Sequence, residues 1–203
     1  AGADHRKAFD TLGVDRFLAQ AVADGVPPFA VASVDGGAKS YWHPREDGTD
    51  SGAMVMDELV PILRGRFSLG TNTALYGWSM GGYGALRLAM RGAAVQAVAA
   101  CSPALFASYG DTAEGSFDSP ADFEANGLRG QGGDFPDVPV RIDCGNGDPF
   151  YFPVRDFVED LPTPPEGGFE DGAHHYGYMR RMLPNEFEFI GEKLAGAVTG
   201  VAP

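Results

Sequence analysis

The chain has only two cysteines, Cys101 and Cys144, among its 203 residues. Two are too few for a disulfide framework, and the sequence contains no Cys-x-x-Cys pair of the kind found in redox or zinc motifs. Both cysteines end stretches that we expect to be buried strands, so we interpret them as thiols that pack like small apolar side chains. A disulfide between them stays an alternative if the two strands are neighbours.

Long apolar runs are also absent. None approaches the roughly 20 residues that a helix needs to span a bilayer, so we expect no membrane-spanning segment. The chain starts at Ala1 and shows no charged and then apolar leader. We therefore expect a soluble protein, either cytoplasmic or secreted after removal of a leader, and the sequence does not choose between these compartments.

Basic residues are scarce: 15 Lys and Arg stand against 28 Asp and Glu, which gives a net charge of −13. A nucleic-acid-binding surface needs a basic patch, so no nucleic-acid partner is expected. The apolar content of 44% and the charged content of 21% are those of an ordinary globular protein. A chain of this length can form one domain with a sizeable core. Nothing in the sequence indicates an oligomeric state.

Apolar stretches of strand length alternate with segments of helical spacing. This alternation predicts an α/β protein, with a mostly parallel sheet flanked by helices, formed by residues 1–203 as a single domain. Residues 102–137 are irregular and rich in Gly, Asp and Ser, which is typical of an insertion or a lid, with a short helix expected within 116–126. The predicted strands are 29–34, 73–76, 95–101, 138–144 and 169–172. The predicted helices include 11–24, 85–90 and 154–161. Two further helices contain a proline: one capped by Ser51 that Pro61 would kink or break, and a closing region 176–198 interrupted near Pro184.

Residues 77–81 read Gly-Trp-Ser-Met-Gly, a G-x-S-x-G motif between the strand at 73–76 and a helix. This context is the one that a nucleophile elbow requires. A serine hydroxyl needs a base to become a good nucleophile, and a sharp turn that presents Ser79 favours glycine at its flanks. The N–H of Met80 would then face an oxyanion. The alternatives are a glycine-rich packing turn and a phosphate-binding loop, although the glycines match neither G-x-G-x-x-G nor a P-loop.

A serine on a nucleophile elbow works with an acid and a histidine that follow it in the chain, in the order serine, acid, histidine. Of the four histidines, only His174 and His175 follow Ser79. They lie in a loop before a helix, where an imidazole could reach the carboxyl edge of a sheet. An exposed pair at a helix start is the alternative. A metal-binding pair is disfavoured because adjacent residues point to different sides, and no metal or cofactor is expected.

The acid that orients the imidazole should follow a core strand near the same edge. Asp148 fits, because it lies four residues beyond Cys144 in a turn before a proline. Asp143 is the second candidate but lies within the strand, whereas Asp134 and Asp137 precede it. As a lone residue, Asp148 would be read as an ordinary surface turn.

Three aromatic residues are candidate substrate-binding groups. Tyr41 and Trp42 lie in a loop after the strand at 29–34, where they would line a pocket. The alternative is that they cover the edge of the core. Trp78 lies inside the serine motif itself.

Taken in order, these motifs resemble the family of α/β-hydrolases that holds esterase D, S-formylglutathione hydrolase and the mycolyltransferases. The resemblance covers about residues 29–195. It rests on Asp35-Gly36-Gly37 with Tyr41-Trp42, on residues 77–85, on Ser102-Pro103-Ala104, on Gly147-Asp148-Pro149-Phe150, and on Gly172-Ala173-His174-His175-Tyr176.

By this resemblance, Ser79 is the nucleophile, Asp148 the acid and His174 the base, and the expected activity is hydrolysis of a small ester through an acyl-enzyme. The family fold has further strands before the one at 29–34, and a loop that donates a second oxyanion N–H. We therefore expect an N-terminally incomplete sheet, with residues 2–5 as the remnant of that loop.

Two other functions stay open at this point. An acyltransferase would use the same triad but pass the acyl group to an alcohol. A non-catalytic binding protein on a hydrolase scaffold would fit the absent first strands but not the intact triad.

Overall fold

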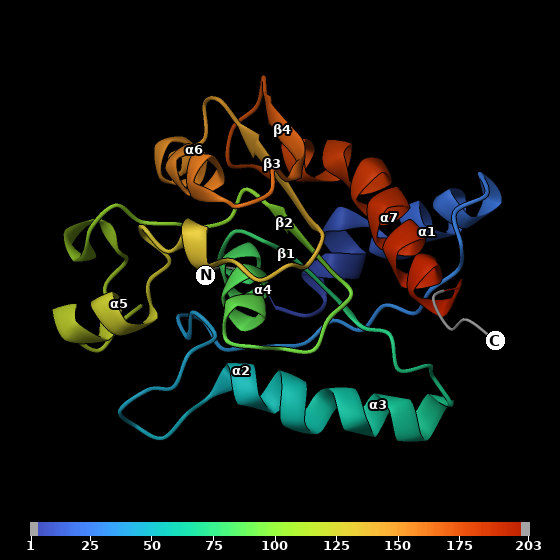
Figure 1. The fold of residues 1–203 in the computed structure, drawn as a ribbon, viewed down its shortest axis with the longest axis horizontal. Helices are drawn as coiled ribbons and strands as arrows, with labels where there is room; N and C mark the ends of the chain where they lie inside the picture. The colour runs from blue at the N-terminus through green and yellow to red at the C-terminus, as the bar shows by residue number, and fades with distance from the viewer. Residues whose placement is uncertain (1–3, 200–203) are drawn as a thin grey trace.

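The computed structural model describes residues 4–199 and shows a four-stranded parallel sheet in the order β1-β2-β3-β4 (Figure 1). The expected α/β class with a parallel sheet is confirmed. Each strand is followed by a crossover that contains at least one helix or turn before the next strand begins. The strands are β1 Ala74–Trp78, β2 Ala97–Cys101, β3 Val140–Gly145 and β4 Glu166–Glu170.

Strand β2 is buried along its whole length, because both faces of the sheet are covered. Its residues alternate between two cores, as the two-residue period of a strand requires. Val98 and Ala100 belong to the core on one face, whereas Ala97, Ala99 and Cys101 belong to the core on the other. The alanines and the thiol leave room for helices to approach closely. Both cysteines are free and buried, as interpreted from the sequence.

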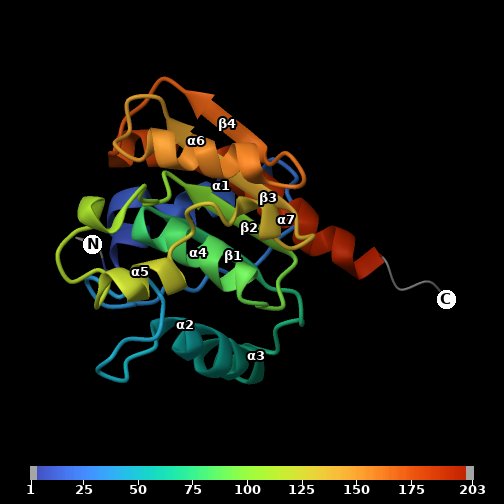
Figure 2. The same ribbon diagram turned by 60° about the vertical axis from the view of Figure 1, so that its left-hand side comes forward.

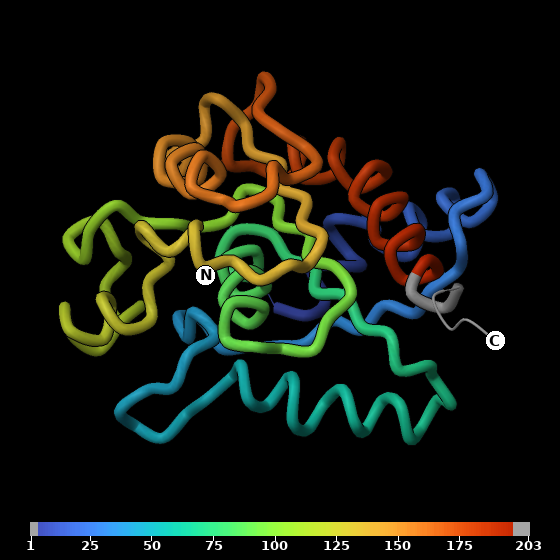
Figure 3. The backbone as a smooth tube through the Cα atoms, viewed as in Figure 1, coloured from blue at the N-terminus to red at the C-terminus, as the bar shows by residue number. Residues whose placement is uncertain are grey.

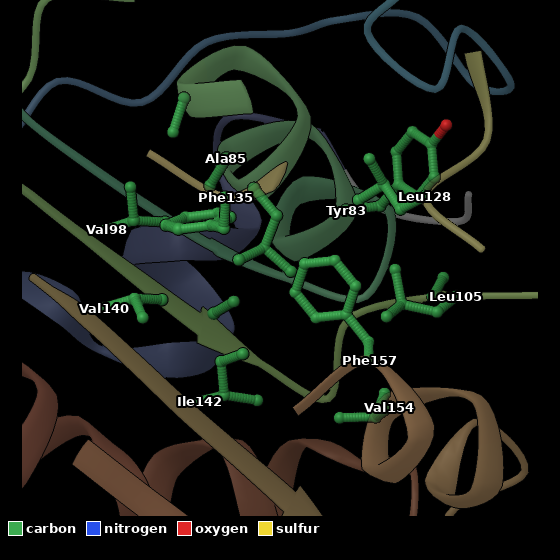
Figure 4. Packing of buried hydrophobic residues seen from close by; sticks show 14 of the residues in the cluster. Tyr83, Ala85, Val98, Leu105, Leu128, Phe135, Val140, Ile142, Val154 and Phe157 are labelled. Carbon is green, nitrogen blue, oxygen red and sulfur yellow. The ribbon is translucent and has the colours of Figure 1, made fainter. Parts of the chain in front are cut away.

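Helices α4 and α6 cover one face of the sheet and helices α1 and α7 cover the other (Figures 1 and 2). Figure 4 shows the packing on the α4 side, where Tyr83 of α4, Phe157 of α6 and Ile142 of β3 belong to one core. The helices are η1 Ala8–Leu12, α1 Val14–Ala23, α2 Ser51–Ala53, η2 Met54–Leu59, α3 Val60–Phe67, α4 Met80–Met90, α5 Pro120–Asn126, α6 Tyr151–Asp160 and α7 Tyr176–Thr199.

The prediction of a strand at residues 29–34 is wrong. A strand needs a partner for its backbone groups, and within residues 4–199 this segment pairs with no other strand. It instead runs along the side of the molecule (Figure 3), where the Phe29 ring packs edge-on against Phe187 of α7 at 5.8 Å. In the described part of the chain, β1 is therefore an edge strand.

Three helix details differ from expectation. Asp50 caps α2, since its side chain accepts the Ala53 N–H at 2.9 Å, whereas Ser51 lies inside the helix and donates its hydroxyl to the Gly36 carbonyl. Pro61 does not break the helical run; it occupies the first turn of α3, where a missing N–H is tolerated, directly after the π-helical η2. Pro184 lies within α7, which continues through it.

The segment 102–137 contains the short helices η3 Tyr109–Asp111 and η4 Gly132–Asp134 besides α5. The helix expected within 116–126 is confirmed. Arg45 fastens the segment to the loop at 39–46 through a bidentate contact with Asp118, the shortest distance being 2.6 Å. This contact holds the Asp118 pKa down to about 2. Whether the segment acts as a lid stays a prediction.

No helix within residues 4–199 combines the length and the apolar character that crossing a bilayer requires.

Candidate active site

The three predicted catalytic residues each lie just after the carboxyl end of a strand. Ser79 comes directly after β1, Asp148 three residues after β3, and His174 four residues after β4. Because the strands are parallel, these ends lie at one edge of the sheet, where the sites of open α/β proteins are usually found.

The three side chains form a continuous chain of hydrogen bonds. The Ser79 Oγ lies 2.9 Å from the Nε2 of His174, and the Nδ1 of His174 lies 2.8 Å from the Oδ2 of Asp148. A neutral imidazole with its proton on Nδ1 satisfies both contacts, since Nδ1 then donates to the carboxylate and Nε2 accepts from the hydroxyl. The residues predicted as hydroxyl, imidazole and acid are therefore brought together.

Ser79 lies on a strained turn, with φ of 53° and ψ of −123°. Such a conformation persists only where the surroundings fix it. Its N–H donates to the Cys101 carbonyl at 3.0 Å, and its own carbonyl accepts the N–H groups of Tyr83 and Ala104, both at 3.0 Å. These three backbone bonds fix the direction in which the hydroxyl is presented.

The expectation that both flanking glycines are required holds for one of them only. A Cβ on Gly77 would lie 2.2 Å from the carbonyl carbon of Gly81, far inside van der Waals contact. A Cβ on Gly81 itself would meet nothing within 4 Å, because Gly81 lies in the first turn of α4 and faces open space.

Met80 is the first residue of α4 and is nearly buried. Its position directly after Ser79 is the one expected of an oxyanion donor, and that role stays a prediction. Of the expected second donor loop, residues 2 and 3 lie outside the described residues. His5, at the end of that loop, lies with its Nδ1 3.5 Å from a carboxyl oxygen of Asp35.

Asp148 is held in an environment that favours its charged form. Burial alone raises its pKa, but the hydrogen bonds from His174 and from the Phe150 N–H, together with the nearby Ser102 hydroxyl, outweigh the burial and leave the pKa lowered. The Phe150 N–H donates to Oδ1 at 2.9 Å, so the two carboxylate oxygens receive different partners.

Asp143 does not reach the imidazole. It forms a bidentate ion pair with Arg141, at 2.7 and 2.9 Å, and burial raises its pKa. Of the two candidate acids, only Asp148 contacts His174.

The two histidines have different partners. His175 accepts the Tyr178 N–H on its Nδ1 at 3.0 Å and so caps the first turn of α7. The loop that carries His174 is tied to the acid turn, since the Gly147 N–H donates to the Gly172 carbonyl at 2.8 Å. This bond fixes the imidazole and the carboxylate relative to each other.

The predicted substrate-binding role of Tyr41 and Trp42 is not supported by their packing. Tyr41 is only 4% exposed and is enclosed by the rings of Tyr83, Phe106 and Phe117, so it has no surface to offer a ligand.

The Trp42 ring fills the space left by the missing side chains of Gly36 and Gly84. Both loop aromatics therefore cover the core, as the alternative expectation had it. Trp78 is half-buried beside Tyr76, and its role in binding stays a prediction.

Sequence reasoning missed two aromatic residues at the site. The Phe150 ring meets the His174 ring edge-on at 5.1 Å, and Phe106 meets Phe150 at 5.5 Å. The position of Phe150, two residues after Asp148, was the available signal. Phe106 gave none, because its segment has no regular structure.

No group of three His, Cys, Asp or Glu side chains within the described part of the chain is placed to hold a metal ion.

A parallel α/β sheet with a serine on a strained turn, and with an acid and a histidine after later strands, defines the α/β-hydrolase class. Residues 4–157 match the model of the family described as "Putative esterase". The chain belongs to this esterase family and is a carboxylic ester hydrolase. A search among curated proteins found no match.

Several solved structures share the fold. A ferulic acid esterase is 17% identical with a TM-score of 0.78, over 94% of this chain and 81% of its own. The fluorophosphonate-binding serine hydrolase FphF of Staphylococcus aureus is 18% identical with a TM-score of 0.75, over 94% and 80%. An S-formylglutathione hydrolase of Agrobacterium tumefaciens is 14% identical with a TM-score of 0.72, over 95% and 81%. At these identities the likeness establishes the fold.

Proposed function

We propose that this protein cleaves carboxylic esters through an acyl-enzyme formed on Ser79, with His174 as general base and Asp148 as the orienting acid. The observation that carries the proposal is the unbroken hydrogen-bond chain from the Ser79 hydroxyl to the enclosed carboxylate, with distances of 2.9 and 2.8 Å. Nucleophile, base and orienting group in hydrogen-bond reach are the arrangement that serine catalysis needs.

In the first half of the reaction, the Ser79 Oγ attacks the ester carbonyl carbon while Nε2 of His174 takes the hydroxyl proton. The carbonyl oxygen gains the negative charge and is stabilised by the Met80 N–H at the start of α4. The imidazolium then gives its proton to the leaving alcohol as the carbon–oxygen bond breaks.

In the second half, His174 takes a proton from water, the hydroxide oxygen attacks the acyl carbon, and the proton returns to the Ser79 oxygen. Asp148 stays ionised throughout and stabilises the imidazolium. The lowered pKa of Asp148 supports this role. No step needs a metal or a cofactor.

The substrate class follows from the surface beside the imidazole. Phe150 is half-buried and lies next to His174, so its ring offers apolar contact to one side of a bound ester. Names of structurally similar proteins point the same way, since one is a ferulic acid esterase and another an S-formylglutathione hydrolase. We propose small esters as substrates.

The test is hydrolysis of a short p-nitrophenyl ester by the wild type and by Ser79→Ala. Removing a triad serine costs on the order of a million-fold in kcat, so the variant should be inactive while its circular dichroism stays unchanged. Wild-type turnover by Ser79→Ala would overturn the assignment.

Added alcohols separate the two fates of the acyl group. Hydrolysis predicts release of free acid at a rate that moderate concentrations of alcohol barely change. A new ester as the main product would instead show an acyltransferase. Absence of both products, together with no labelling by a fluorophosphonate, would support a non-catalytic scaffold.

A further inference from the structure

Four neighbouring strands place four polar side chains at the same edge of the sheet. The function proposed above uses those after β1, β3 and β4, but β2 lies between β1 and β3 and ends in a serine of its own, Ser102. By its place in the strand order, Ser102 lies between the turn that carries Ser79 and the turn that carries Asp148.

The backbone around Ser102 is tied to both of these turns. Its N–H donates to the Asp143 carbonyl on β3 at 2.7 Å. Two residues on, the Ala104 N–H donates to the Ser79 carbonyl at 3.0 Å. Residues 102–104 are therefore a fixed bridge between the nucleophile turn and the strand that leads to the acid.

Ser102 is an unfavourable choice for this position if only the turn matters. Its φ is +46°, a value that favours glycine, and its side chain is completely buried. Within residues 4–199, no group forms a hydrogen bond of full geometry with this buried hydroxyl. A buried hydroxyl without a partner destabilises a fold, so stability alone would favour glycine over serine at this position. The serine is therefore expected to have a role that depends on its hydroxyl.

This role is found at the neighbouring carboxylate. Burial raises the Asp148 pKa, and the nearby Ser102 hydroxyl opposes that effect, after His174 and the Phe150 N–H. The Cys144 thiol lies beside both this carboxylate and the Ser102 hydroxyl, and burial raises its pKa to about 12, so it stays neutral.

We propose that Ser102 is a positioning residue for the acid, and that its hydroxyl donates a third hydrogen bond to the Asp148 carboxylate. This inference rests on the proposed function. Each carboxylate oxygen accepts more than one bond, so the Ser102 hydroxyl joins the Phe150 N–H and His174 without displacing either. With three donors the carboxylate is locked in one rotamer and delivers His174 to Ser79 in one orientation.

Loss of the hydroxyl has a signature that a structural role does not share. A carboxylate with one donor fewer holds the protonated imidazole more strongly. The acidic limb of the kcat/KM profile should therefore move to higher pH. The change should appear in kcat, because the acid acts on the base and not on the bound substrate.

The experiment compares Ser102→Ala, Ser102→Gly and Ser116→Ala. The first keeps a Cβ at the positive φ, the second relaxes the backbone, and both lack the hydroxyl. Ser116 is a matched control, since it is also fully buried and no group in residues 4–199 forms a hydrogen bond of full geometry with its hydroxyl. It differs from Ser102 in its place, because it lies beside Tyr41. Both Ser102 variants should lose about tenfold in kcat, with the same shift of the acidic limb, and Ser116→Ala should show neither change.

A second readout does not depend on turnover. The downfield proton signal of the His174 Nδ1–H group should move in Ser102→Ala and Ser102→Gly and stay in place in Ser116→Ala. Wild-type kcat, pH profile and proton signal in folded Ser102→Gly would overturn the positioning role. If Ser79→Ala keeps its activity, the proposed function fails instead, and the proton signal still decides whether Ser102 contacts the acid.

Discussion

The Oδ2 of Asp148 lies 2.8 Å from the Nδ1 of His174, and the Asp148 side chain is completely enclosed while the imidazole keeps 25% of its surface exposed. This arrangement suits a general base. The buried carboxylate holds one side of the imidazole in place, and the exposed side stays accessible to substrate.

Replacing the two candidate acids should therefore give opposite results. Asp148→Asn should lower kcat roughly 10,000-fold, because an amide no longer selects the productive tautomer of His174. Asp143→Asn should keep near-normal kcat but lose about 3–5 kcal/mol of stability, because Arg141 loses its buried partner. Ester hydrolysis and urea unfolding of both variants measure this, and an active Asp148→Asn would refute the assignment of the acid.

The adjacent histidines offer a second matched pair. His174→Ala should abolish ester hydrolysis, since no other base within residues 4–199 is hydrogen-bonded to the Ser79 hydroxyl. His175→Ala should stay active and lose about 1 kcal/mol of stability, the usual cost of removing a helix cap. Steady-state kinetics and thermal melts separate the two effects. Inactivity of His175→Ala at full stability would show that the roles are reversed.

The two glycines of the serine motif should differ in their tolerance of alanine. Gly77→Ala places a Cβ 2.2 Å from the Gly81 carbonyl carbon and should cost about 3 kcal/mol or more. Gly81→Ala meets open space on a helix and should leave stability unchanged or raise it by up to about 1 kcal/mol. Melting temperatures decide this, and equal losses in both variants would contradict the turn geometry.

Stability should fall as the pH rises through neutrality because of Glu186. This carboxyl on α7 is fully buried, and burial, followed by the charge of Asp143, raises its pKa from 4.5 to about 8. Between these values the native state holds a proton that the unfolded chain has released, so unfolding becomes easier as the pH rises, by up to about 1.4 kcal/mol per unit.

Glu186→Gln keeps the volume and cannot ionise. Its melting temperature should change less than that of the wild type between about pH 5 and pH 8. Parallel curves for the two proteins would show that Glu186 does not control this dependence.

Much of the sheet could be predicted from apolar runs, because strands buried on both faces leave that signature. The runs at 73–76, 95–101 and 138–144 became β1, β2 and β3 with shifts of one or two residues. The run at 29–34 has the same composition but no strand beside it in residues 4–199, and composition carries no information about partners. Pro184 was expected to interrupt α7, but a helix packed along a sheet tolerates one missing backbone bond.

The site was predictable where chain order and motif agree, as for Ser79, Asp148 and His174. It was not predictable where burial decides. Tyr41 looked like a pocket residue because its loop follows an apolar run, but its ring lies in the core. Ser102 gave no signal of its role, because its positive φ and its enclosure are set by contacts with β3 and with the Ser79 turn.

The most direct test of the account is to map the adduct of a fluorophosphonate by mass spectrometry of the digested protein. We expect a single modification on Ser79 in the wild type, strongly slowed labelling in His174→Ala, and unchanged labelling in His175→Ala. Labelling at another serine, or labelling of Ser79 at the same rate without His174, would contradict it.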